Sequence, residues 1–139
     1  MDTDSHTDEE LRKFYGLRNI AVVGMSKNEE KAASYVPKYL IDHGYNVIPV
    51  NPTASQILGK KCYERVSEIP DRIDIVDVFR PSDAVPAVIE DSMKKPGISL
   101  IWLQEGIHNE AAERMAREKS IAVVFNRCMM AEHRRLFEQ

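Results

Sequence analysis

The residues that follow the first apolar segment have the types and spacing of a phosphate-binding loop. The apolar run stops at Gly24, and the segment after it carries Ser26, Lys27, Lys31 and Ser34 just before a helix. The free N–H groups and the dipole of a helix N-terminus favour an anion, and hydroxyl and ammonium groups beside it add donors and positive charge. Two interpretations stay open for this loop: a site for a phosphate group, or a solvated loop whose glycine makes a tight exit from a strand.

This loop lacks the fingerprint of a dinucleotide-binding protein. A G-x-G-x-x-G pattern starts the helix almost at once and brings its N-terminus to the pyrophosphate. Here only Gly24 is present, about nine residues before the expected helix cap. Asn51 and Pro52 follow the second apolar segment, where an Asp or Glu would bind the ribose of NAD. The pattern therefore disfavours an NAD(P)-binding domain.

The cysteines and histidines show no metal-binding spacing. Cys62 and Cys128 form no C-x-x-C pattern. Cys128 stands beside Arg127, whose guanidinium favours the thiolate, but a structural, unreactive cysteine is the favoured interpretation. We expect no metal site, and we interpret the four histidines as surface residues: His6, His43, His108 and His133. No Walker, H-E-x-x-H or G-x-S-x-G pattern is present, so P-loop and hydrolase activities have no support.

These groups are positioned by apolar segments that alternate with amphipathic ones. The apolar segments are typical of strands buried on both faces and span 20–24, 47–50, 73–79, 98–103 and 121–125. Within the second segment, Pro49 indicates an irregular or early end of the strand. Helices are predicted after the Thr7–Glu10 capping box, over 35–43 with Ser34 as N-cap, after Ser82, over 109–119 and in the last eleven residues. Pro37 would then lie in the first turn of its helix, where its missing N–H has no intrahelical partner.

This alternation predicts βαβ units with right-handed crossovers. We expect an α/β fold: a Rossmann-like, doubly wound parallel sheet of five strands in the order 3-2-1-4-5, with helices on both faces and one domain over residues 1–139. In such a sheet, ligands bind beyond the carboxyl ends of the strands, near the point where the strand order reverses. The residues at the strand ends are therefore the candidate site.

The charge balance disfavours several partners. Nineteen Lys and Arg against 22 Asp and Glu give a net charge of −3, which argues against a nucleic-acid partner that needs many phosphates neutralised. No apolar stretch reaches the roughly 20 residues that span a bilayer, and the acidic start lacks the pattern of an export signal. We expect a cytoplasmic protein with no membrane association, and the sequence indicates no particular protein partner.

Six segments at the expected strand ends share their order and residue types with one family. They are AVVGMSK at 21–27, SY at 34–35, GYNVIPVNP at 44–52, VDVFRP at 76–81, IWLQEGI at 101–107 and NRC at 126–128. Together they closely resemble the stand-alone CoA-binding domain proteins, which are similar to the CoA-binding domain at the start of the succinyl-CoA synthetase α subunit. The resemblance covers roughly residues 10–136.

The resemblance implies that coenzyme A is the ligand and assigns parts of it to particular residues. Gly24, Met25, Ser26 and Lys27 would lie along the phosphates, beside Ser34, Tyr35 and Val36 at the helix start, and Asn51 and Pro52 would border the nucleotide. Phe79, Arg80 and Pro81 would flank the adenosine, and the pantetheine path and its end would be lined by Trp102, Leu103, Gln104, Glu105, Gly106, Asn126 and Cys128. Met25 replaces a smaller residue that is common in the family, which could narrow the phosphate loop.

The resemblance does not extend to the ligase reaction, because the phosphorylated histidine of the synthetase belongs to a second domain. We therefore expect a module that binds free CoA or an acyl-CoA without catalysis. The alternative is an enzyme or redox sensor that acts on a CoA thioester through Cys128 or Glu105, and in the redox version Cys128 forms a mixed disulfide with CoA. An NAD(P)-binding domain is the second alternative.

Overall fold

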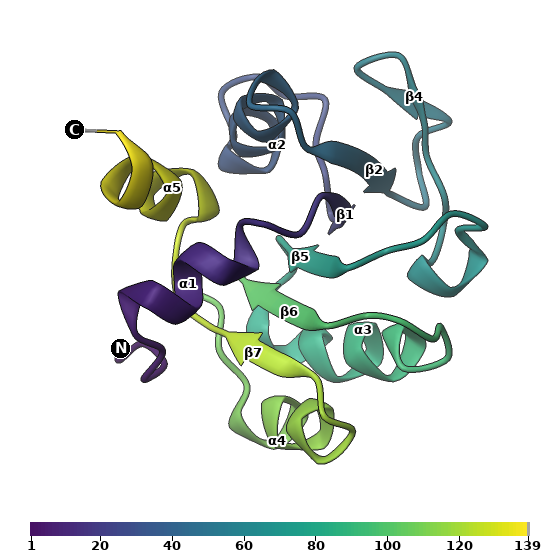
Figure 1. Cartoon of the computed structure of the whole chain (residues 1–139). Helices are drawn as coiled ribbons and strands as arrows, with labels where there is room; N and C mark the ends of the chain where they lie inside the picture. Colours follow the sequence, from purple (N-terminus) through teal and green to yellow (C-terminus); the bar gives the residue numbers. More distant parts are fainter. Residues whose placement is uncertain (139) are drawn as a thin grey trace.

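The computed structural model describes residues 1–138 and contains a five-stranded parallel sheet (Figure 1). Its strands, in the order β2-β1-β5-β6-β7, are β2 (Asn46–Val50), β1 (Asn19–Val23), β5 (Ile75–Val78), β6 (Leu100–Leu103) and β7 (Ala122–Val124). A separate antiparallel hairpin of β3 (Gln56–Ile57) and β4 (Lys60–Lys61) lies in the connection from β2 to β5. The expected α/β class and the parallel sheet of five strands are confirmed.

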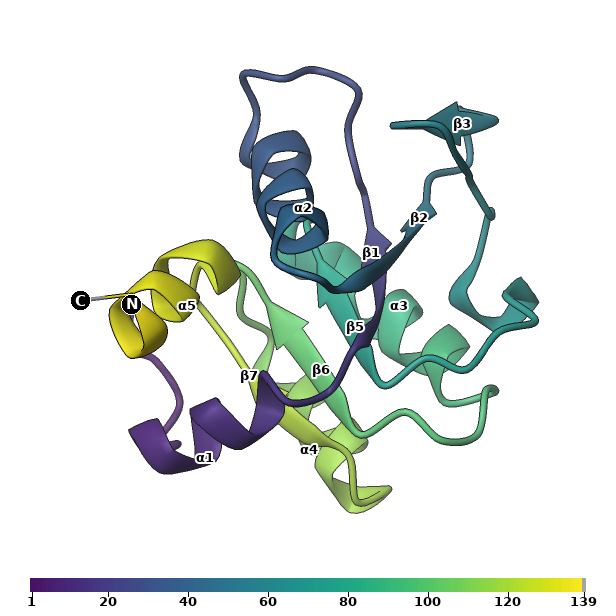
Figure 2. The ribbon, with the colours of Figure 1, turned by 45° about the horizontal axis from the view of Figure 1, so that its top comes forward.

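Helices cover both faces of the sheet (Figures 1 and 2). One face carries α1 (Asp8–Phe14), α2 (Ala32–Asp42) and α5 (Met129–Phe137), and the other carries α3 (Val85–Ser92) and α4 (Glu110–Glu118). Short 3₁₀ turns at Val66–Glu68 and Ser82–Ala84 precede β5 and α3. The capping box predicted at Thr7 and Glu10 starts α1, as expected. The last predicted helix is also present, and its final expected residue, Gln139, lies outside the described part of the chain.

Alternate residues of each strand supply two hydrophobic cores. On β1, Ile20 and Val22 pack under α1, α2 and α5, whereas Ala21 and Val23 pack toward α3 and α4. Side chains of a strand point alternately to the two faces of the sheet, so a strand covered on both faces must be apolar at successive positions. This is why the strands stand out in the sequence as continuous apolar runs.

The order of the strands differs from the expected one. Numbered along the chain, the five strands run 2-1-3-4-5 rather than 3-2-1-4-5, because β5 lies between β1 and β6 instead of beyond β2. All of β5 is buried, as suits a central strand. The edge is β2, where Pro49 has no N–H to donate and is tolerated for that reason. Proline in the second strand is the sequence signal that favours this edge position.

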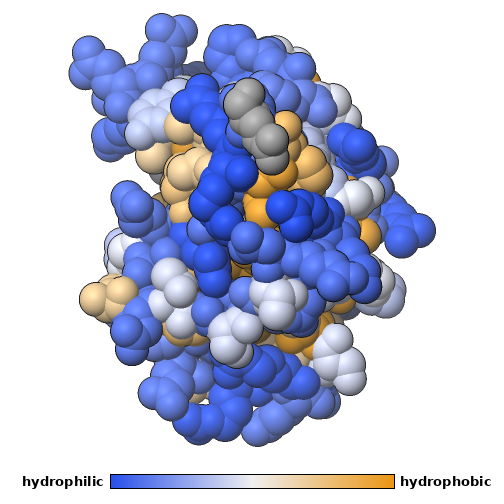
Figure 3. All heavy atoms as spheres, turned by 60° about the vertical axis from the view of Figure 1, so that its left-hand side comes forward, coloured by the Kyte–Doolittle hydropathy of each residue, from blue (hydrophilic) through white to orange (hydrophobic). Residues whose placement is uncertain are grey.

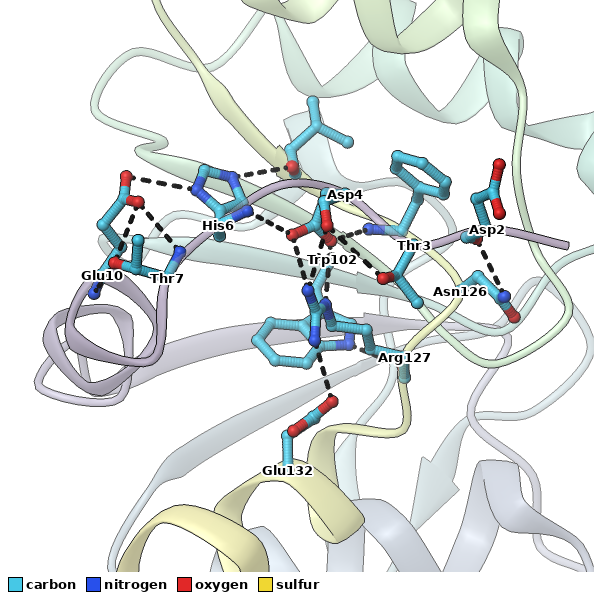
Figure 4. Close-up of polar contacts among 12 residues, drawn as sticks. Asp2, Thr3, Asp4, His6, Thr7, Glu10, Trp102, Asn126, Arg127 and Glu132 are labelled. Atoms are coloured by element: carbon cyan, nitrogen blue, oxygen red, sulfur yellow. Dashed lines mark hydrogen bonds and ion pairs between the residues drawn. The ribbon is translucent and has the colours of Figure 1, made fainter.

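The first residues of the chain run along the free edge of β7 (Figure 4). Nε2 of His6 lies 3.0 Å from the carbonyl oxygen of Val123, and the N–H of Phe125 donates to Oδ2 of Asp4 at 3.0 Å. These contacts provide partners for backbone groups that an edge strand leaves exposed. The N-terminal segment therefore covers the side of the sheet opposite β2.

The surface seen from the side of α1 and α5 is mostly hydrophilic, with a small hydrophobic area in its upper half (Figure 3). Large side chains that are about half exposed include Tyr35 on α2, Leu58 in the hairpin turn and Phe137 on α5. None of the helices formed by residues 1–138 is long and apolar enough to cross a membrane.

Candidate functional site

The loop after β1 approaches the loop after β5 so closely that only glycine fits at position 24. Gly24 has a φ of +85°, a conformation that L side chains rarely adopt, and a Cβ built on it would lie 2.9 Å from the carbonyl oxygen of Phe79. The same Cβ would lie 3.3 Å from Cδ of Arg80. The glycine thus lets the two strand ends meet at the point where the chain order reverses.

Asn51 connects the loop after β2 to the loop after β1. Its Nδ2 donates to the carbonyl oxygen of Met25 at 2.9 Å, and its Oδ1 accepts from the backbone N–H and the hydroxyl of Thr53, both at 2.8 Å. The side chain of Met25 is fully buried with Val36 in the core beneath α2. Because it fills the core, this methionine does not narrow the loop as the sequence suggested.

Helix α2 begins earlier than expected, with Lys31 rather than Ser34 as its N-cap. Pro37 consequently lies inside the helix and has no N–H to donate to the carbonyl of Ala33 one turn before it. That carbonyl accepts instead from the N–H of Ser26 at 3.0 Å. The proline therefore frees an acceptor that fixes the loop after β1 against the first turn of α2, where the unpaired N–H groups of a helix favour an anion.

A cleft of about 730 Å³ opens between the carboxyl ends of β1, β2 and β5. The predicted site residues that line it are Gly24, Met25, Ser26, Lys27, Asn51, Pro52, Phe79 and Arg80. Lys27 and Lys31 on one side and Arg80 on the other supply three positive charges against the single carboxylate of Glu64. The cleft is therefore electropositive and suits an anionic ligand.

Several lining residues were not among the predicted site residues. Thr53 and Ala54 directly follow the predicted pair Asn51–Pro52, so their position in the same loop is the signal that could have indicated them. Glu64 and Val88 come from the β2–β5 connection and from α3, and no local pattern marks them. They reach the cleft only because the sheet places β5, and the segments around it, next to β1.

Ser34 lies beside the cleft rather than in it. It is buried in the first turn of α2 and lines a second hollow of about 420 Å³, which it shares with Ser26 and Lys27. The hairpin residues Ser55–Gly59 form the other wall of this hollow. The loop after β1 thus separates two hollows and offers Ser26 and Lys27 to both.

The remaining predicted site residues do not line the cleft. Three of them are fully buried in the hydrophobic cores and present no side-chain surface to a ligand: Val36, Trp102 and Leu103. Exposed side chains outside the cleft belong to Tyr35, Pro81 and Glu105, and Gly106 is exposed with them. The structure therefore separates the ends of β6 and β7 from the cleft formed by β1, β2 and β5.

A buried polar network fills the region next to the end of β6. Asp77 on β5 is completely buried, and its Oδ1 accepts from Nε2 of Gln104, whose Oε1 in turn accepts from the N–H of Met129 at 3.2 Å. Oδ2 of Asp77 has no hydrogen-bond partner among the described residues. Burial raises the pKa of Asp77 to about 7, although the hydrogen bond from Gln104 acts in the opposite direction.

The segment after β7 is held by hydrogen bonds to the N-terminal segment and to α5 (Figure 4). The guanidinium of Arg127 donates to Asp4 at 3.0 Å and to Glu132 at 3.1 Å. Oδ1 of Asn126 accepts a hydrogen bond from the backbone N–H of Gly106 at 2.6 Å. Cys128 is the N-cap of α5, and its Sγ accepts from a backbone N–H in the first turn of that helix. The arginine expected to activate Cys128 is therefore paired with two carboxylates.

Comparison with known proteins places most of this chain in one family. The CoA binding domain family matches residues 18–134. The uncharacterized protein YneT of Bacillus subtilis is 39% identical over 116 residues, which cover 84% of this chain and 85% of YneT. A hypothetical protein from Pyrococcus horikoshii with a solved structure is 42% identical, with a TM-score of 0.92 over 95% of this chain and 93% of that one.

A larger enzyme shares only this region. The ADP-forming acetate–CoA ligase of Methanocaldococcus jannaschii is 35% identical over 88 residues, which cover 63% of this chain but only 12% of the ligase. The family match over 18–134 includes every residue that lines the cleft. The chain belongs to the CoA-binding domain family and is homologous to the CoA-binding parts of acyl-CoA ligases.

Proposed function

We propose that this chain binds coenzyme A in the cleft between β1, β2 and β5, with residues 1–139 acting as one CoA-binding domain. The approach of Gly24 to the carbonyl of Phe79 carries the proposal, because a Cβ at position 24 would meet the backbone of Phe79 and the side chain of Arg80, where β1 and β5 end at the cleft. A glycine that allows close backbone approach in the loop between a strand and a helix is typical of sites that bind the phosphates of a nucleotide.

The charges of the cleft match the phosphates of CoA. CoA carries a pyrophosphate and a 3′-phosphate, so it needs several cations and helix N–H groups, while its adenine and pantetheine need apolar surface. We assign the pyrophosphate to the side of Lys27 and Lys31, and the adenosine to the side of Phe79 and Arg80. Free CoA and an acyl-CoA share all these groups, so the cleft is expected to accept both.

The proposed role is binding without catalysis. Glu105 and Cys128, the two groups considered for chemistry on a thioester, lie outside the cleft. Most of the acetate–CoA ligase lies beyond the matched region, so its reaction is not assigned to this chain. NAD stays disfavoured, because the loop from Gly24 to Ala32 is longer than a dinucleotide fingerprint allows.

Calorimetric titration with CoA, acetyl-CoA, dephospho-CoA and NAD tests the proposal. We expect CoA and acetyl-CoA to bind equally well and dephospho-CoA about tenfold more weakly, because it lacks one charged group and its charge-assisted hydrogen bonds. Tighter binding of NAD than of CoA, or no binding of CoA, would overturn the proposal. Native mass spectrometry of freshly purified protein then shows whether the cell supplies free CoA or an acyl-CoA.

A further inference from the structure

A cluster of metal-binding side chains lies at the end of α2 that is far from the cleft. Helix α5 packs beside α2 (Figures 1 and 2), which brings His133 on α5 next to His43, the C-cap of α2. Glu138, the C-cap of α5, completes the cluster. One ligand atom from each of the three lies within 4.8 Å of the other two. Their separation in the sequence explains why no spacing pattern predicted them.

The hydrogen bond made by His43 determines which of its nitrogens is free. Nδ1 lies 2.7 Å from the carbonyl oxygen of Tyr39, and because a carbonyl only accepts, Nδ1 carries the hydrogen. In the neutral ring Nε2 then has a lone pair, and it lies 3.4 Å from Oε1 of Glu138. Two acceptors that face each other at this distance need a cation between them, which is either a proton or a metal ion.

Tyr39 orients the other two side chains of the cluster. Its hydroxyl donates to Oε1 of Glu138 at 3.2 Å and lies 2.7 Å from Nδ1 of His133. With its hydrogen directed to Glu138, the phenol oxygen accepts from Nδ1 of His133, and Nε2 of that ring keeps a lone pair. Neighbouring groups that fix the tautomer and orientation of a histidine are typical of metal-binding histidines.

We propose that His43, His133 and Glu138 bind a Zn²⁺ ion that joins the end of α2 to α5. Two imidazole nitrogens and one carboxylate oxygen form a ligand set that Zn²⁺ uses in proteins, with water in the fourth position. The side chains of His43 and Glu138 are 35% and 51% exposed, so water can reach the ion. The nearby cation Arg134 lies 4.0 Å from Oε2 of Glu138, whereas His43 contacts Oε1.

The position of this site gives it a structural consequence. Helix α2 begins at the cleft with Lys31 as its N-cap and ends at the metal-binding cluster with His43 as its C-cap. An ion bound to both α2 and α5 would restrain the helix whose first turn faces the CoA phosphates. The zinc site itself does not depend on CoA, and it can be tested without that ligand.

Calorimetric titration of the metal-free chain with ZnSO₄ tests the site. We expect one ion per chain, and at least about tenfold weaker binding for His43→Gln and for Glu138→Gln. His108→Gln is the matched control: His108 also contacts a carboxylate, 2.6 Å away on Glu113, but within residues 1–138 no third metal-binding side chain joins that pair. This control should bind Zn²⁺ like the native chain.

Substitution with Co²⁺ identifies the ligands. We expect the visible bands of a tetrahedral Co²⁺ site with nitrogen and oxygen ligands, without a thiolate-to-cobalt charge-transfer band, and we expect these bands to be lost in His133→Gln. Because Glu138 is exposed at the end of α5, Glu138→Gln should keep the native circular dichroism even where a histidine variant does not. Unchanged Zn²⁺ affinity in Glu138→Gln, or a thiolate band from Cys62 or Cys128, would overturn the proposal.

Discussion

The carboxyl edge of the sheet has an open half and a closed half. The open half, beyond β1, β2 and β5, holds the cleft with Lys27, Lys31 and Arg80. The closed half, beyond β6 and β7, is filled by the network around Gln104 and by the contacts of Arg127 with the N-terminal segment and α5. Both halves end in polar residues, so a polar strand end does not by itself make a ligand site.

The difference between the halves is whether the polar groups find partners within the chain. Arg127 is held by two carboxylates, and both ends of the amide of Gln104 are hydrogen-bonded. By contrast, the side chains of Lys27 and Arg80 form no hydrogen bond or ion pair with the rest of residues 1–138. A charged group without a partner on a concave surface is available to a ligand, whereas a paired one mainly positions its own segment.

The largest effect is expected in the closed half, at Asp77. Burial raises the pKa of Asp77 from 3.8 to about 7 in the folded chain. At a pH between these two values, the carboxyl group is protonated in the folded chain and ionised in the unfolded chain. The resulting stability is fully present below the unfolded pKa and is lost as the pH rises through about 7. Asp77→Asn stays neutral, so at pH 8 it should be more stable than the native chain by on the order of 4 kcal/mol, and equally stable near pH 3.5.

Urea unfolding between pH 3.5 and 8 measures this difference, and Asp74→Asn is its control. Burial acts to raise the pKa of Asp74, but hydrogen bonds from Asn19 and Arg72 lower it overall. Its contribution is present above the unfolded pKa and lost as the pH falls, so Asp74→Asn should be destabilised at pH 8. A pH profile of Asp77→Asn parallel to that of the native chain would mean that water reaches Asp77 and that this half is not closed.

The next effect is expected in the open half, at Gly24. Gly24→Ala should weaken CoA binding by about 100-fold or more, because the new Cβ would meet the backbone of Phe79 and displace the loop. Gly97→Ala is the control, since Gly97 also has a positive φ of +92° but no atom within 4 Å of its Cβ position. Both variants should lose stability from the strained φ, and only Gly24→Ala should lose CoA affinity in calorimetry. Equal CoA affinity in the two variants would place the phosphates elsewhere.

A smaller effect is expected for the free cations of the cleft. Lys27→Ala and Arg80→Ala should each weaken CoA binding by about 10- to 100-fold, because a charge-assisted hydrogen bond contributes roughly 1.5–3 kcal/mol. Added salt should reduce the difference between variant and native chain, since it screens these charges. Lys119→Ala, an exposed lysine at the end of α4, controls for the change in net charge. Unchanged affinity with both Lys27 and Arg80 replaced would contradict the proposed phosphate site.

The sequence predicts the open half better than the closed half. The open half is marked by local patterns: a glycine after a buried strand, lysines before a helix, and Asn51–Pro52 after the next strand. The residues of these patterns all line one cleft. The pairing of Arg127 with Asp4 joins opposite ends of the chain, so no local pattern reports it. The position of β5 depends on a long crossover, and Pro49 is the one local signal that β2 is the edge.

The smallest expected effect concerns Cys128, the residue proposed from the sequence to bond with CoA. Cys128→Ser should change CoA affinity by less than about twofold, because Cys128 caps α5 outside the cleft and serine is a good N-cap. Intact mass after incubation with CoA disulfide checks the two thiols separately, with Cys62→Ser as the second variant. Burial raises the pKa of the Cys62 thiol, although the charge of Lys27 acts in the opposite direction. A reducible adduct of CoA mass that disappears only in Cys128→Ser would show that the pantetheine reaches the end of β7. It would contradict the separation of the open half from the closed half.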